Sequence, residues 1–445
     1  MGLTGLDIFK QLPKTNCGDC GVPTCLAFAM KLAQKQASLD QCPHVSEEAK
    51  AALEGASAPP IKLVTIGVGD RKLEIGNETV LFRHEETFYH QTGIGVLVDA
   101  SLAEDELKKQ VAAIGEARFE RVGQELRLDI AALKGEGEQL VEAARVAAAE
   151  SAVPLILMNE DAETMGQALA GCAEKRPLIY AATAENVEAM ASLAKEHGCP
   201  LAVRGEDVSS LAEVSEKAQA AGATDLVLDS GARRPAEVLA NETAIRRAAL
   251  RKRFRPFGFP TITFPEAEDR LGEAIQASSY IMKYAGIAVI GGMEAWELLT
   301  LVTVRQNIYT DPQKPIQIEE GVYEIGTPDE DSPVLVTTNF SLTYFTVEGD
   351  VEASRVPAWV VVVDTEGTSV LTAWAAEKFT AEIIAERVKA FDVGSKVKHR
   401  KIILPGHVAV LSGKLEEELS YEWKVLVGPR ESSGIPSFLR TSWSQ

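Results

Sequence analysis

This sequence has few basic residues for its number of acidic ones, few cysteines and histidines, and no long apolar run. These shortages exclude several classes of protein. The 45 Lys and Arg residues are outnumbered by 65 Asp and Glu, a net charge of −20, so the surface repels nucleic acid and anionic membranes. No apolar run reaches the roughly 18 residues of a membrane helix. No basic-then-apolar signal peptide begins the chain. We therefore expect a cytoplasmic protein that binds neither nucleic acid nor a membrane.

The most basic stretch, residues 246–255, is short. We interpret it as the solvated face of a helix, because a run of charge without interleaved binding motifs usually covers a helix surface. The basic stretch is a small part of a chain that is long enough for two to four domains.

Only six cysteines occur, and four of them lie in the first tenth of the chain. Cys17, Cys20, Cys25 and Cys42 have the spacing C-x2-C-x4-C-x16-C. In a reducing compartment, thiols clustered in this way are more typical of metal ligands than of disulfides. The other two, Cys172 and Cys199, are isolated, and we expect them to be small buried apolar residues.

The spacing of the four cysteines favours a [4Fe–4S] cluster. Such a cluster takes one thiolate per iron, and the two short gaps allow one loop to supply three of the ligands. Gly18 and Gly21 allow the backbone to bend around the cluster, and Pro43 directly after the fourth cysteine is usual in ferredoxin-type sites. A structural zinc site is the alternative, but zinc motifs usually pair two C-x2-C units and only one pair here has that spacing.

Residues 1–57 are predicted to form a small domain around these cysteines. Leu3, Leu6, Phe9 and Leu12 recur at every third position and could make one face of a helix, and residues 25–33 read as a second, Ala-rich helix. The stretch 54–60, rich in Ala, Ser and Pro, reads as a linker.

Residues 58–320 show repeated alternation of strand and helix patterns. A hairpin is predicted first, from the runs 61–68 and 72–75, and helical segments such as 137–149, 184–197 and 211–221 separate most of the later strands. The alternation implies a parallel sheet, and its length fits a (β/α)8 TIM barrel whose N-terminal end the hairpin closes. A long doubly wound sheet is the alternative. The strand-like runs after the hairpin are 79–82, 95–98, 126–130, 154–158, 178–181, 201–203, 225–228, 260–264 and 287–290.

Polar residues follow several of the predicted barrel strands, where barrel enzymes keep their chemistry. They are Asp99, Asn159 to Asp161, Arg204 to Asp207, Asp229 and Ser230. No nucleophile–base pair, metal triad or phosphate-binding motif can be assembled from them, and helix N-capping explains most of them. We therefore expect the barrel to be a scaffold or a docking surface.

Residues 321–445 are predicted to form an open α/β sheet of flavodoxin-like or Rossmann-like type. Its strands are 334–336, 359–363, 401–404 and 424–427. The loops that follow them, rich in hydroxyls and glycine, are 337–340, 364–369, 405–407 and 428–434. In such sheets the loops at the carboxyl ends of the strands converge on a ligand. His407 lies in one of these loops, where we expect helix capping or loop packing rather than ligand contact.

The C-terminal domain also contains two distinctive segments, TTNFSLTYFTVEGD at 337–350 and DTEGTSVLTAWAAEKF at 364–379. Together with the C-x2-C-x4-C-x16-C-P segment and the predicted barrel, they make essentially the whole chain resemble the large (gamma) subunit of the corrinoid iron–sulfur protein. That family belongs to the reductive acetyl-CoA (Wood–Ljungdahl) pathway of anaerobic bacteria and archaea. The cysteine motif is shared with other iron–sulfur proteins, so the C-terminal segments make the resemblance specific.

The resemblance implies a methyl carrier with two cofactors. A corrinoid in the last domain would accept the methyl group of methyltetrahydrofolate on Co(I), through a separate methyltransferase, and deliver it to acetyl-CoA synthase/CO dehydrogenase. The cluster on Cys17, Cys20, Cys25 and Cys42 would reduce accidentally formed Co(II) back to Co(I). The partner within the protein would be a small (delta) barrel subunit, in a heterodimer.

The resemblance also assigns the corrinoid to the strand-end loops of residues 321–445. The last domain lacks the D-x-H-x-x-G signature by which many cobalamin proteins supply a lower-face histidine, so we expect a base-off corrinoid without a side-chain ligand to cobalt. The predicted contacts are Asn339, Phe340, Thr343, Thr346, Thr368, Ser369, Val370, Leu371, Thr372, Ala373, Gly434, Ile435 and Pro436.

A second function remains open at this point: an iron–sulfur electron-transfer or structural subunit whose last domain binds a nucleotide or flavin. The chain has neither a GxGxxG nor a GxxxxGK[ST] loop in that domain, which counts against dinucleotides and nucleoside triphosphates.

Overall fold

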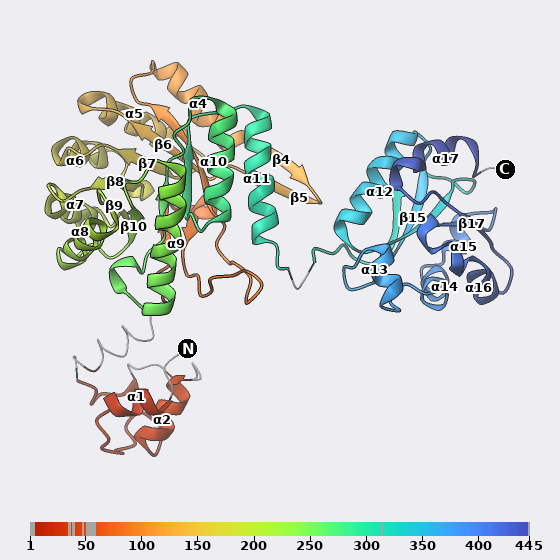
Figure 1. Cartoon of the computed structure of the whole chain (residues 1–445), viewed down its shortest axis with the longest axis horizontal. Coiled ribbons are helices and arrows are strands. Elements are labelled where there is room, and N and C mark those ends of the chain that lie inside the picture. Colours follow the sequence, from red (N-terminus) through yellow and green to blue (C-terminus); the bar gives the residue numbers. More distant parts are fainter. Residues whose placement is uncertain are drawn as a thin grey trace. The chain divides into compact units, whose positions relative to one another are not determined.

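The computed structural model describes residues 5–33, 37, 41–46, 49, 59–312 and 315–443. Leu3, most of the predicted linker and the predicted boundary between residues 57 and 58 lie outside the described residues. Contacts divide the chain into one compact unit built on residues 1–81, 89–114 and 129–293, and a second built on 82–88, 115–128 and 294–445 (Figure 1). In the described part, no helix has both the length and the apolar composition that crossing a bilayer would demand.

Two short helices form the N-terminal region, α1 (Gly5–Gln11) and α2 (Cys25–Ala33). Ile8, within α1, and Leu12, just after its end, are buried, but Leu6 is 58% exposed. The prediction of one apolar face through Leu6, Phe9 and Leu12 was therefore wrong for Leu6, because the buried face of a 3.6-residue helix here runs through positions four apart.

The central sheet has eight parallel strands, and the helices that alternate with them along the chain complete eight βα repeats. Strands that follow one another in the chain are neighbours in the sheet, and the first and last strands, β3 and β12, also pair with each other. A bridge between Leu228 and Thr261 joins β10 to β11, so the sheet curls into a barrel. The TIM-barrel prediction is confirmed. The strands are β3 (Gly93–Asp99), β6 (Ile130–Lys134), β7 (Leu155–Met158), β8 (Leu178–Ala182), β9 (Leu201–Arg204), β10 (Leu226–Asp229), β11 (Ile262–Thr263) and β12 (Ile287–Ile290).

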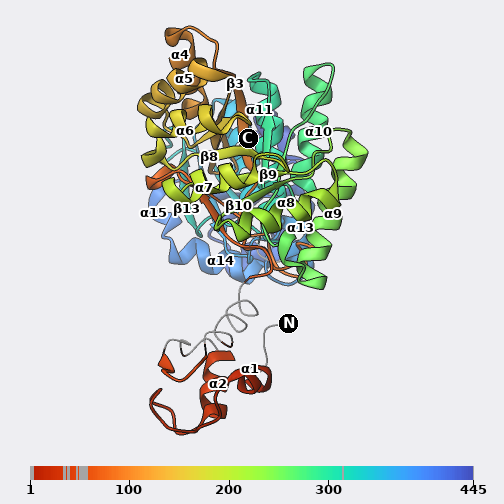
Figure 2. The same ribbon diagram turned by 90° about the vertical axis from the view of Figure 1, so that its left-hand side faces the viewer.

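The helices of these repeats are Ala-rich and amphipathic, and Figure 2 shows α6, α7 and α8 on the outside of the strands. Their starts follow ordinary capping chemistry: the Asp161 side chain accepts from the N–H of Thr164, and Asp207 forms a capping box with Ser210. The helices are α4 (Glu104–Glu116), α5 (Gly137–Glu150), α6 (Ala162–Ala170), α7 (Val187–His197), α8 (Val208–Ala220), α9 (Pro235–Lys252), α10 (Arg270–Met282) and α11 (Ala295–Tyr309).

An antiparallel hairpin, β1 (Val64–Ile66) and β2 (Leu73–Ile75), closes the N-terminal end of the barrel as predicted. Val64, Ile66 and Ile75 have no exposed surface and pack in one cluster with residues that begin barrel strands, such as Ile130 and Leu178. The hairpin therefore fills the bottom of the barrel and leaves the opposite end, where the strands finish, accessible.

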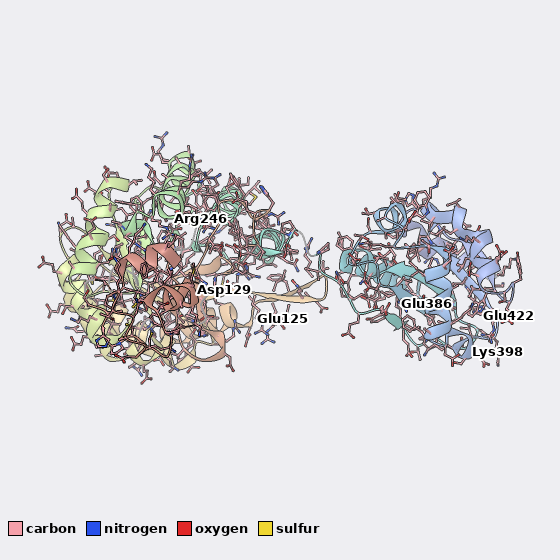
Figure 3. The ribbon with its side chains drawn as sticks, turned by 90° about the horizontal axis from the view of Figure 1, so that it is seen from below. Glu125, Asp129, Arg246, Glu386, Lys398 and Glu422 are labelled. Carbon is pink, nitrogen blue, oxygen red and sulfur yellow. The ribbon has the colours of Figure 1, made fainter. Side chains whose placement is uncertain are left out.

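The predicted strand at 79–82 is absent, and side chains satisfy the backbone there instead. Arg246 donates to the carbonyl of Val80 over 2.7 Å, and the Glu78 carboxylate accepts the N–H groups of Tyr89 and His90 at 3.0 Å. Arg246, labelled in Figure 3, is 6% exposed, and its guanidinium lies 3.5 Å from the Glu78 carboxylate. The interpretation of residues 246–255 as a solvated face is therefore wrong for Arg246.

Residues 126–130 do not form the single strand that was predicted. They span the end of one strand and the start of the next. A second antiparallel hairpin, β4 (Arg118–Arg121) and β5 (Gln124–Arg127), ends before β6 begins at Ile130. In the second unit, Arg121 donates to the Gln306 side chain of α11, and Gln306 donates back to the Arg121 carbonyl at 3.1 Å.

The C-terminal sheet has five strands in the order β13-β15-β14-β16-β17. The four predicted strands are present and parallel, and an antiparallel edge strand, β13, was missed because its half-exposed sequence shows no apolar run. The strands are β13 (Gly321–Ile325), β14 (Val334–Thr338), β15 (Ala358–Val363), β16 (Lys401–Leu404) and β17 (Lys424–Val427).

Helices cover both faces of this sheet. Val336 and Val361 point to one face and pack with α14, α15 and α16, whereas Leu335 and Val360 point to the other and pack with α12 and α17. The alternation of neighbouring residues between two cores is the period-2 pattern of a strand buried on both sides. The helices are α12 (Ser341–Ser354), α13 (Val370–Ala375), α14 (Ala381–Ala390), α15 (Val393–Lys396), α16 (Ser412–Glu418) and α17 (Ile435–Thr441).

One buried carboxyl group should make the stability of the barrel depend on pH. Glu242 of α9 is 2% exposed and accepts a 2.6 Å hydrogen bond from Thr261, and burial raises the pKa of its carboxyl from 4.5 to about 8. Between those pH values the folded protein holds a proton that the unfolded chain releases, so stability falls as pH rises. Glu242→Gln should remove this slope, which is at most about 1.4 kcal/mol per pH unit.

The measurement is native-state hydrogen exchange of β10 and β11 across the range in which the parent should lose stability, in the parent and the variant. The variant should become the more stable protein towards the alkaline end. Parallel pH profiles for the two proteins would contradict the assignment of a neutral, buried Glu242.

Candidate functional site

The cysteine loop lies between α1 and α2. Cys25 is 6% exposed and belongs to an apolar cluster with Phe28 and Ala29, and Cys20 and Cys42 pack against the same cluster. The side chain of Asn16 accepts the N–H of Cys25 at 2.8 Å, which holds the start of α2. Three of the four thiols therefore face one small core, and the fourth, Cys17, is exposed.

The backbone of this loop suits a bulky inorganic group. Gly18 and Gly21 have φ of +83° and +75°, and no described atom lies within 4 Å of the position where either would carry a Cβ. Left-handed glycines with open space beside them can turn their N–H groups toward bound sulfur. Four thiols, two such glycines and an apolar floor fit a four-thiolate cluster.

Cys17 also has two polar neighbours. Its sulfur, one Asp19 oxygen and a His44 ring nitrogen all lie within 4.8 Å of one another, and Asp19 and His44 are 2.6 Å apart. The hydrogen bond from His44 lowers the pKa of the Asp19 carboxyl. All three residues are exposed, and this group draws on only one cysteine, so it accounts for the four-cysteine pattern less well than a cluster does.

Cys172 and Cys199 are buried, as predicted. Burial raises the pKa of the Cys172 thiol to about 12 and that of Cys199 to about 11. Neutral, enclosed thiols are poor nucleophiles and poor metal ligands. These two cysteines therefore belong to the packing of the barrel.

The open end of the barrel contains a cavity of about 1270 Å³. At its floor Asp229 accepts hydrogen bonds from Tyr180 at 2.6 Å and from Arg233 at 2.8 Å, and the Arg233 guanidinium lies over the Phe264 ring. Burial, and then the Asp229 charge, raise the pKa of Tyr180 well above its usual value. The charged and hydroxyl groups of this network are already paired within the protein, which favours a structural role.

Helix capping explains fewer of the other polar residues at the strand ends than predicted. Asp161 and Asp207 cap α6 and α8, and Asp99 accepts the N–H of Ser101 at 2.8 Å. Asn159 donates to the Gly135 carbonyl at 2.7 Å. Arg204 pairs with Glu160 at 2.6 Å, and Asp229 is the centre of a buried ion network, so these residues are not caps either.

The C-terminal sheet has its own cavity, of about 320 Å³, at the carboxyl ends of β14 and β16. Successive strands β14 and β15 are neighbours, but the chain then returns to the far side of β14 to form β16, so the order reverses between β14 and β16. The helices that leave two such strands depart to opposite faces and open a crevice, which is where open α/β sheets bind ligands.

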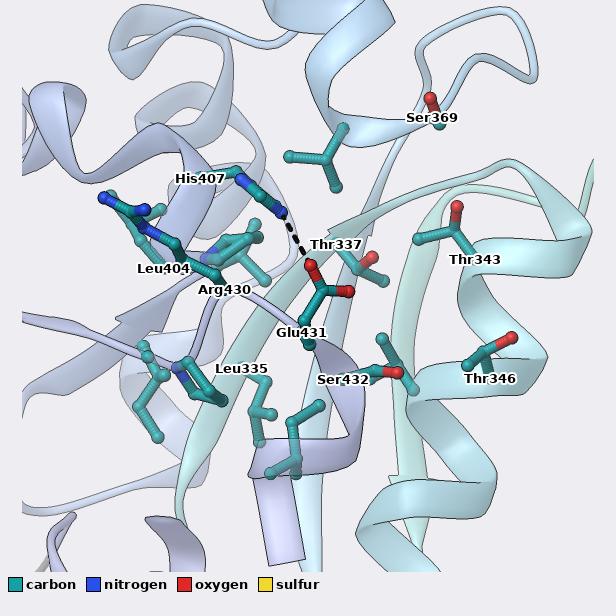
Figure 4. Close-up of a pocket in the computed structure, with 18 of the residues that line it drawn as sticks. Leu335, Thr337, Thr343, Thr346, Ser369, Leu404, His407, Arg430, Glu431 and Ser432 are labelled. Atoms are coloured by element: carbon teal, nitrogen blue, oxygen red, sulfur yellow. Dashed lines mark ion pairs between the residues drawn. The ribbon is translucent and has the colours of Figure 1, made fainter.

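A buried hydroxyl of this cavity has no partner. Thr337 lines the cavity, is 1% exposed, and its hydroxyl makes no hydrogen bond to any described residue (Figure 4). Thr338 and Ser341 also bury hydroxyls without a partner among the described residues, but neither lines the cavity. Leaving such a group unpaired costs about 1–3 kcal/mol. The cavity therefore presents a donor that a bound amide or phosphate oxygen could satisfy.

The loops after β16 and β17 place a second polar group at the cavity. His407 and Glu431 face each other there, with the His407 ring nitrogen 3.6 Å from a Glu431 oxygen (Figure 4). Arg430 and Ser432 also line the cavity. His407 thus lines the cavity, a position that its predicted role in capping or packing did not include.

The thirteen residues predicted to contact a corrinoid fall into two groups. Thr343, Thr346, Ser369, Val370, Leu371 and Ile435 line the cavity. Asn339, Phe340, Thr368, Thr372, Ala373, Gly434 and Pro436 do not. The second group is largely occupied with local structure.

Asn339 is the clearest member of that second group. Its side chain donates to Asp364 at 2.8 Å and accepts the N–H groups of Thr365 and Gly367 at 2.9 and 3.0 Å, so it holds the loop after β15. Ala373 is fully buried in the core, and Gly434 packs tightly on Pro429. α13 has only six residues, so the N–H groups at its start belong to a very short helix.

The polar cavity residues that were not predicted come from the same loops. Thr337, His407, Arg430, Glu431 and Ser432 all lie within the four loops that the strand pattern indicated. The signal that could have found Thr337 is its place as a polar residue near the end of an otherwise apolar strand. The apolar wall, including Leu335 and Ile403, required the register of β14 and β16.

Matches to known proteins extend over nearly the whole chain. Residues 63–439 match the family described as CO dehydrogenase/acetyl-CoA synthase delta subunit, and residues 12–44 match a family described as a putative Fe-S cluster. A dihydropteroate synthase from Thermus thermophilus covers 55% of the chain and all of its own length, at 17% identity and a TM-score of 0.39. That score is too low to bear on fold or function.

Relatives of the same length are more informative. The corrinoid/iron-sulfur protein large subunit of Moorella thermoacetica is 50% identical over 445 residues, covering 99% of both chains. The acetyl-CoA decarbonylase/synthase complex subunit gamma of Methanothermobacter thermautotrophicus is 38% identical, again over 99% of both. With its cysteine loop, its barrel and its C-terminal α/β sheet all included in these matches, the chain belongs to the family of corrinoid/iron–sulfur protein large subunits and acetyl-CoA decarbonylase/synthase gamma subunits.

Proposed function

We propose that this chain is the large subunit of a corrinoid methyl carrier. It takes the methyl group of methyltetrahydrofolate from a separate methyltransferase and hands it to acetyl-CoA synthase/CO dehydrogenase. The observation that carries the proposal is the cavity between β14 and β16, which contains an unpaired buried hydroxyl and, among the described residues that line it, no Gly-rich phosphate loop. We further propose that the C-terminal sheet is of flavodoxin-like type, with the corrinoid over its reversal point.

Two resident cofactors supply the reactive chemistry. When bound, the corrinoid supplies a cobalt that, as Co(I), accepts and later gives up a methyl group, and a [4Fe–4S] cluster supplies the single electrons that restore Co(I). The thiolates of Cys17, Cys20, Cys25 and Cys42 hold the cluster. The apolar packing around Cys25 keeps water from that side of the thiolates, and exposure to water is one of the factors that set a cluster's potential.

The residues around the C-terminal cavity bind part of the corrinoid. A volume of about 320 Å³ is at the lower end of the range for small-ligand pockets, so it accepts only a portion of so large a molecule. The hydroxyls of Thr337, Thr343 and Ser369 border this space and can pair with amide or phosphate oxygens. The exposed side chains of Leu342 and Leu371, at its edge, offer an apolar surface to the remainder.

Neither His399 nor His407 would coordinate the cobalt of a bound corrinoid in this proposal. Both ring nitrogens of His399 are used, by the Ser332 carbonyl and the Lys401 N–H. His407 is paired with Glu431 and stands in Pro-Gly-His-Val-Ala rather than in the D-x-H-x-x-G signature. Without a strong protein ligand, the cobalt would be easier to reduce to the state that accepts the methyl group.

The barrel serves as a scaffold in this proposal. Its cavity floor is internally paired, so it offers no obvious catalytic group, and the partners are expected to dock on its outer surfaces or on the C-terminal domain. We propose a heterodimer with a small subunit, acting in the cytoplasm. Metal analysis of the anaerobic protein, coexpressed with its small subunit in a corrinoid-replete host, should find iron and cobalt. Full iron with no cobalt would overturn the proposal and favour a nucleotide- or flavin-binding electron-transfer subunit.

Thr337→Val tests the cavity. The change keeps the shape of the side chain and removes the hydroxyl, so corrinoid affinity should fall by about two- to tenfold, the worth of one hydrogen bond. The stability of the corrinoid-free protein should stay level or rise, because an unpaired buried hydroxyl disappears. Affinity is measured by titrating corrinoid into the apoprotein.

Thr338→Val is the matched control, because the Thr338 hydroxyl is also buried and without a partner among the described residues but does not line the cavity. Equal effects of the two variants on affinity would contradict the role of Thr337.

Cys20→Ala tests the cluster. Protein that has already been reduced should transfer methyl groups at nearly the parent rate, whereas reactivation of Co(II) should stop, because the cluster loses a ligand. Cys172→Ala, at a buried thiol outside the loop, should change neither rate. Equal loss of both activities in Cys20→Ala would point to a structural role for the cluster.

His407→Ala tests whether His407 coordinates cobalt. The electron paramagnetic resonance spectrum of the Co(II) protein should lack nitrogen splitting from a histidine, and the variant should have the same spectrum. A splitting in the parent that vanished in the variant would identify His407 as a ligand instead.

A further inference from the structure

The tip of the β4–β5 hairpin uses a residue that such turns normally avoid. The two strands pair as far as Arg121 and Gln124, so Val122 and Gly123 form a two-residue turn. Both have positive φ, +54° and +68°. Turns of this kind favour Asn-Gly, because a β-branched side chain such as that of valine is strained in the left-handed region. Val122 therefore carries a strain that the hairpin alone does not require.

Hydrogen bonds attach the hairpin firmly to α11. The buried side chain of Gln306 donates to the Arg121 carbonyl at 3.1 Å and to the Gln124 side chain at 2.9 Å. Arg305, which is also buried, donates to the Arg127 carbonyl at 2.6 Å. The tip therefore projects from a fixed base and not from a free loop.

The tip meets α12, which belongs to the same compact unit. A Cβ added to Gly123 would lie 2.5 Å from Cζ of the Phe345 ring and 2.8 Å from its Cε2. Phe345 is half-buried, and its ring packs edge-on against Tyr344 with the ring centres 5.2 Å apart. Only glycine at position 123 leaves room for the outer edge of this ring, so the tip and the ring form a close contact.

α12 connects this contact to the C-terminal cavity. Thr343, Thr346 and Val347 line the cavity, and Phe345 lies between them in the sequence. Because hydrogen bonds between successive turns make a helix stiff, its residues move together. The position of Phe345 at the tip therefore bears on the position of one wall of the cavity.

Like charges oppose the contact. Glu348 lies three positions after Phe345, on the same side of α12. Burial raises the pKa of the Glu348 carboxyl, and the charges of Glu352 and of Glu120, which belongs to β4, raise it further, whereas a hydrogen bond from Tyr344 lowers it. A ring edge held at a single point against such repulsion is a contact that can separate and form again.

We propose that Val122 and Gly123 are a releasable stop for α12, which holds one wall of the cavity in place while the Phe345 ring is docked. Val122 is half-buried. An Asn-Gly turn would relieve its strain, but it would place a polar side chain beside the ring, where valine offers an apolar surface. Both are positioning residues, because they act on the cavity through α12 and do not line it.

The consequence for ligand binding rests on the proposed corrinoid site, whereas the contact itself does not. If docking of the ring and binding of the ligand both depend on α12, each must favour the other by the same factor. Corrinoid should therefore increase the docked fraction of the ring, and loss of the stop should lower the affinity for corrinoid.

The test uses the full chain with its small subunit, in which 4-fluorophenylalanine replaces Phe345. Its fluorine stands on the ring carbon nearest Gly123, so the fluorine resonance distinguishes docked from free rings with little change in size. Gly123→Asn fills the space of the ring edge, and asparagine tolerates a left-handed backbone. Gly137→Asn is the matched control, because Gly137 also has positive φ, +50°, but no described atom lies within 4 Å of its added Cβ.

We expect Gly123→Asn to reduce the docked fraction by about fivefold or more and to weaken corrinoid binding by about fivefold, the lower end of typical couplings between two sites. Gly137→Asn should change neither quantity. In the parent, titration with corrinoid should increase the docked fraction.

Two further variants should act in opposite directions. Val122→Asn should slow hydrogen exchange in residues 118–127, because the turn improves, and yet reduce the docked fraction. Glu120→Gln should increase the docked fraction by up to about fivefold at low ionic strength and by less at high ionic strength, because it removes a repelling charge.

A fluorine resonance that Gly123→Asn left unchanged would overturn the inference, because the ring would not be docked on the tip. So would undocking without any loss of corrinoid affinity, since the stop would then not control the cavity wall. If Gly123→Asn loosened the hairpin itself, Glu120→Gln would decide, and an unchanged docked fraction in that variant would overturn the inference. Failure of the methyl-carrier proposal would look different: no corrinoid bound, with the fluorine resonance still responding to Gly123→Asn.

Discussion

The reversal of strand order between β14 and β16 is the constraint on which the C-terminal domain depends. The helix after β14 and the segment after β16 leave the sheet in different directions, so no helix can cover the carboxyl ends of both strands. A cavity remains there, and Thr337 near the end of β14 buries a hydroxyl that no described residue pairs. A fold normally avoids such a group, so its position at the cavity supports the proposal that a ligand binds there.

The two proposed cofactor sites differ in construction. The cysteine loop would hold its group through thiolate ligands and has little more than two short helices, an apolar floor and glycines that bend. The C-terminal cavity would hold its group through many weak contacts and is built on a complete sheet with helices on both faces. A strong ligand set can be held by a small domain, whereas binding through hydroxyls and apolar walls requires a rigid frame.

The barrel lies between these two regions in the sequence. Many enzymes share its architecture, but the polar side chains at its cavity floor are already paired with one another. Asp229 could serve as an acid or base in another setting, but Tyr180 and Arg233 already satisfy it. Its closed floor and the hairpin that fills its other end make a stable body. That arrangement is consistent with a part of the molecule that positions other parts and offers surface to partners.

The sequence by itself determined the cysteine pattern on which the proposed ligand set rests, the alternation of strands and helices, and the four loops around the C-terminal cavity, because each is a local pattern of spacing or periodicity. Only the tertiary structure decided which residues of those loops face the cavity. Asn339 turned inward to hold residues 364–367, and Thr337 was left facing the cavity, through contacts between segments more than twenty residues apart. The burial of Arg246 and the exposure of Leu6 were decided in the same way. Periodicity predicts which side chains share one face of a helix or strand. Whether that face is buried depends on the elements that pack against it.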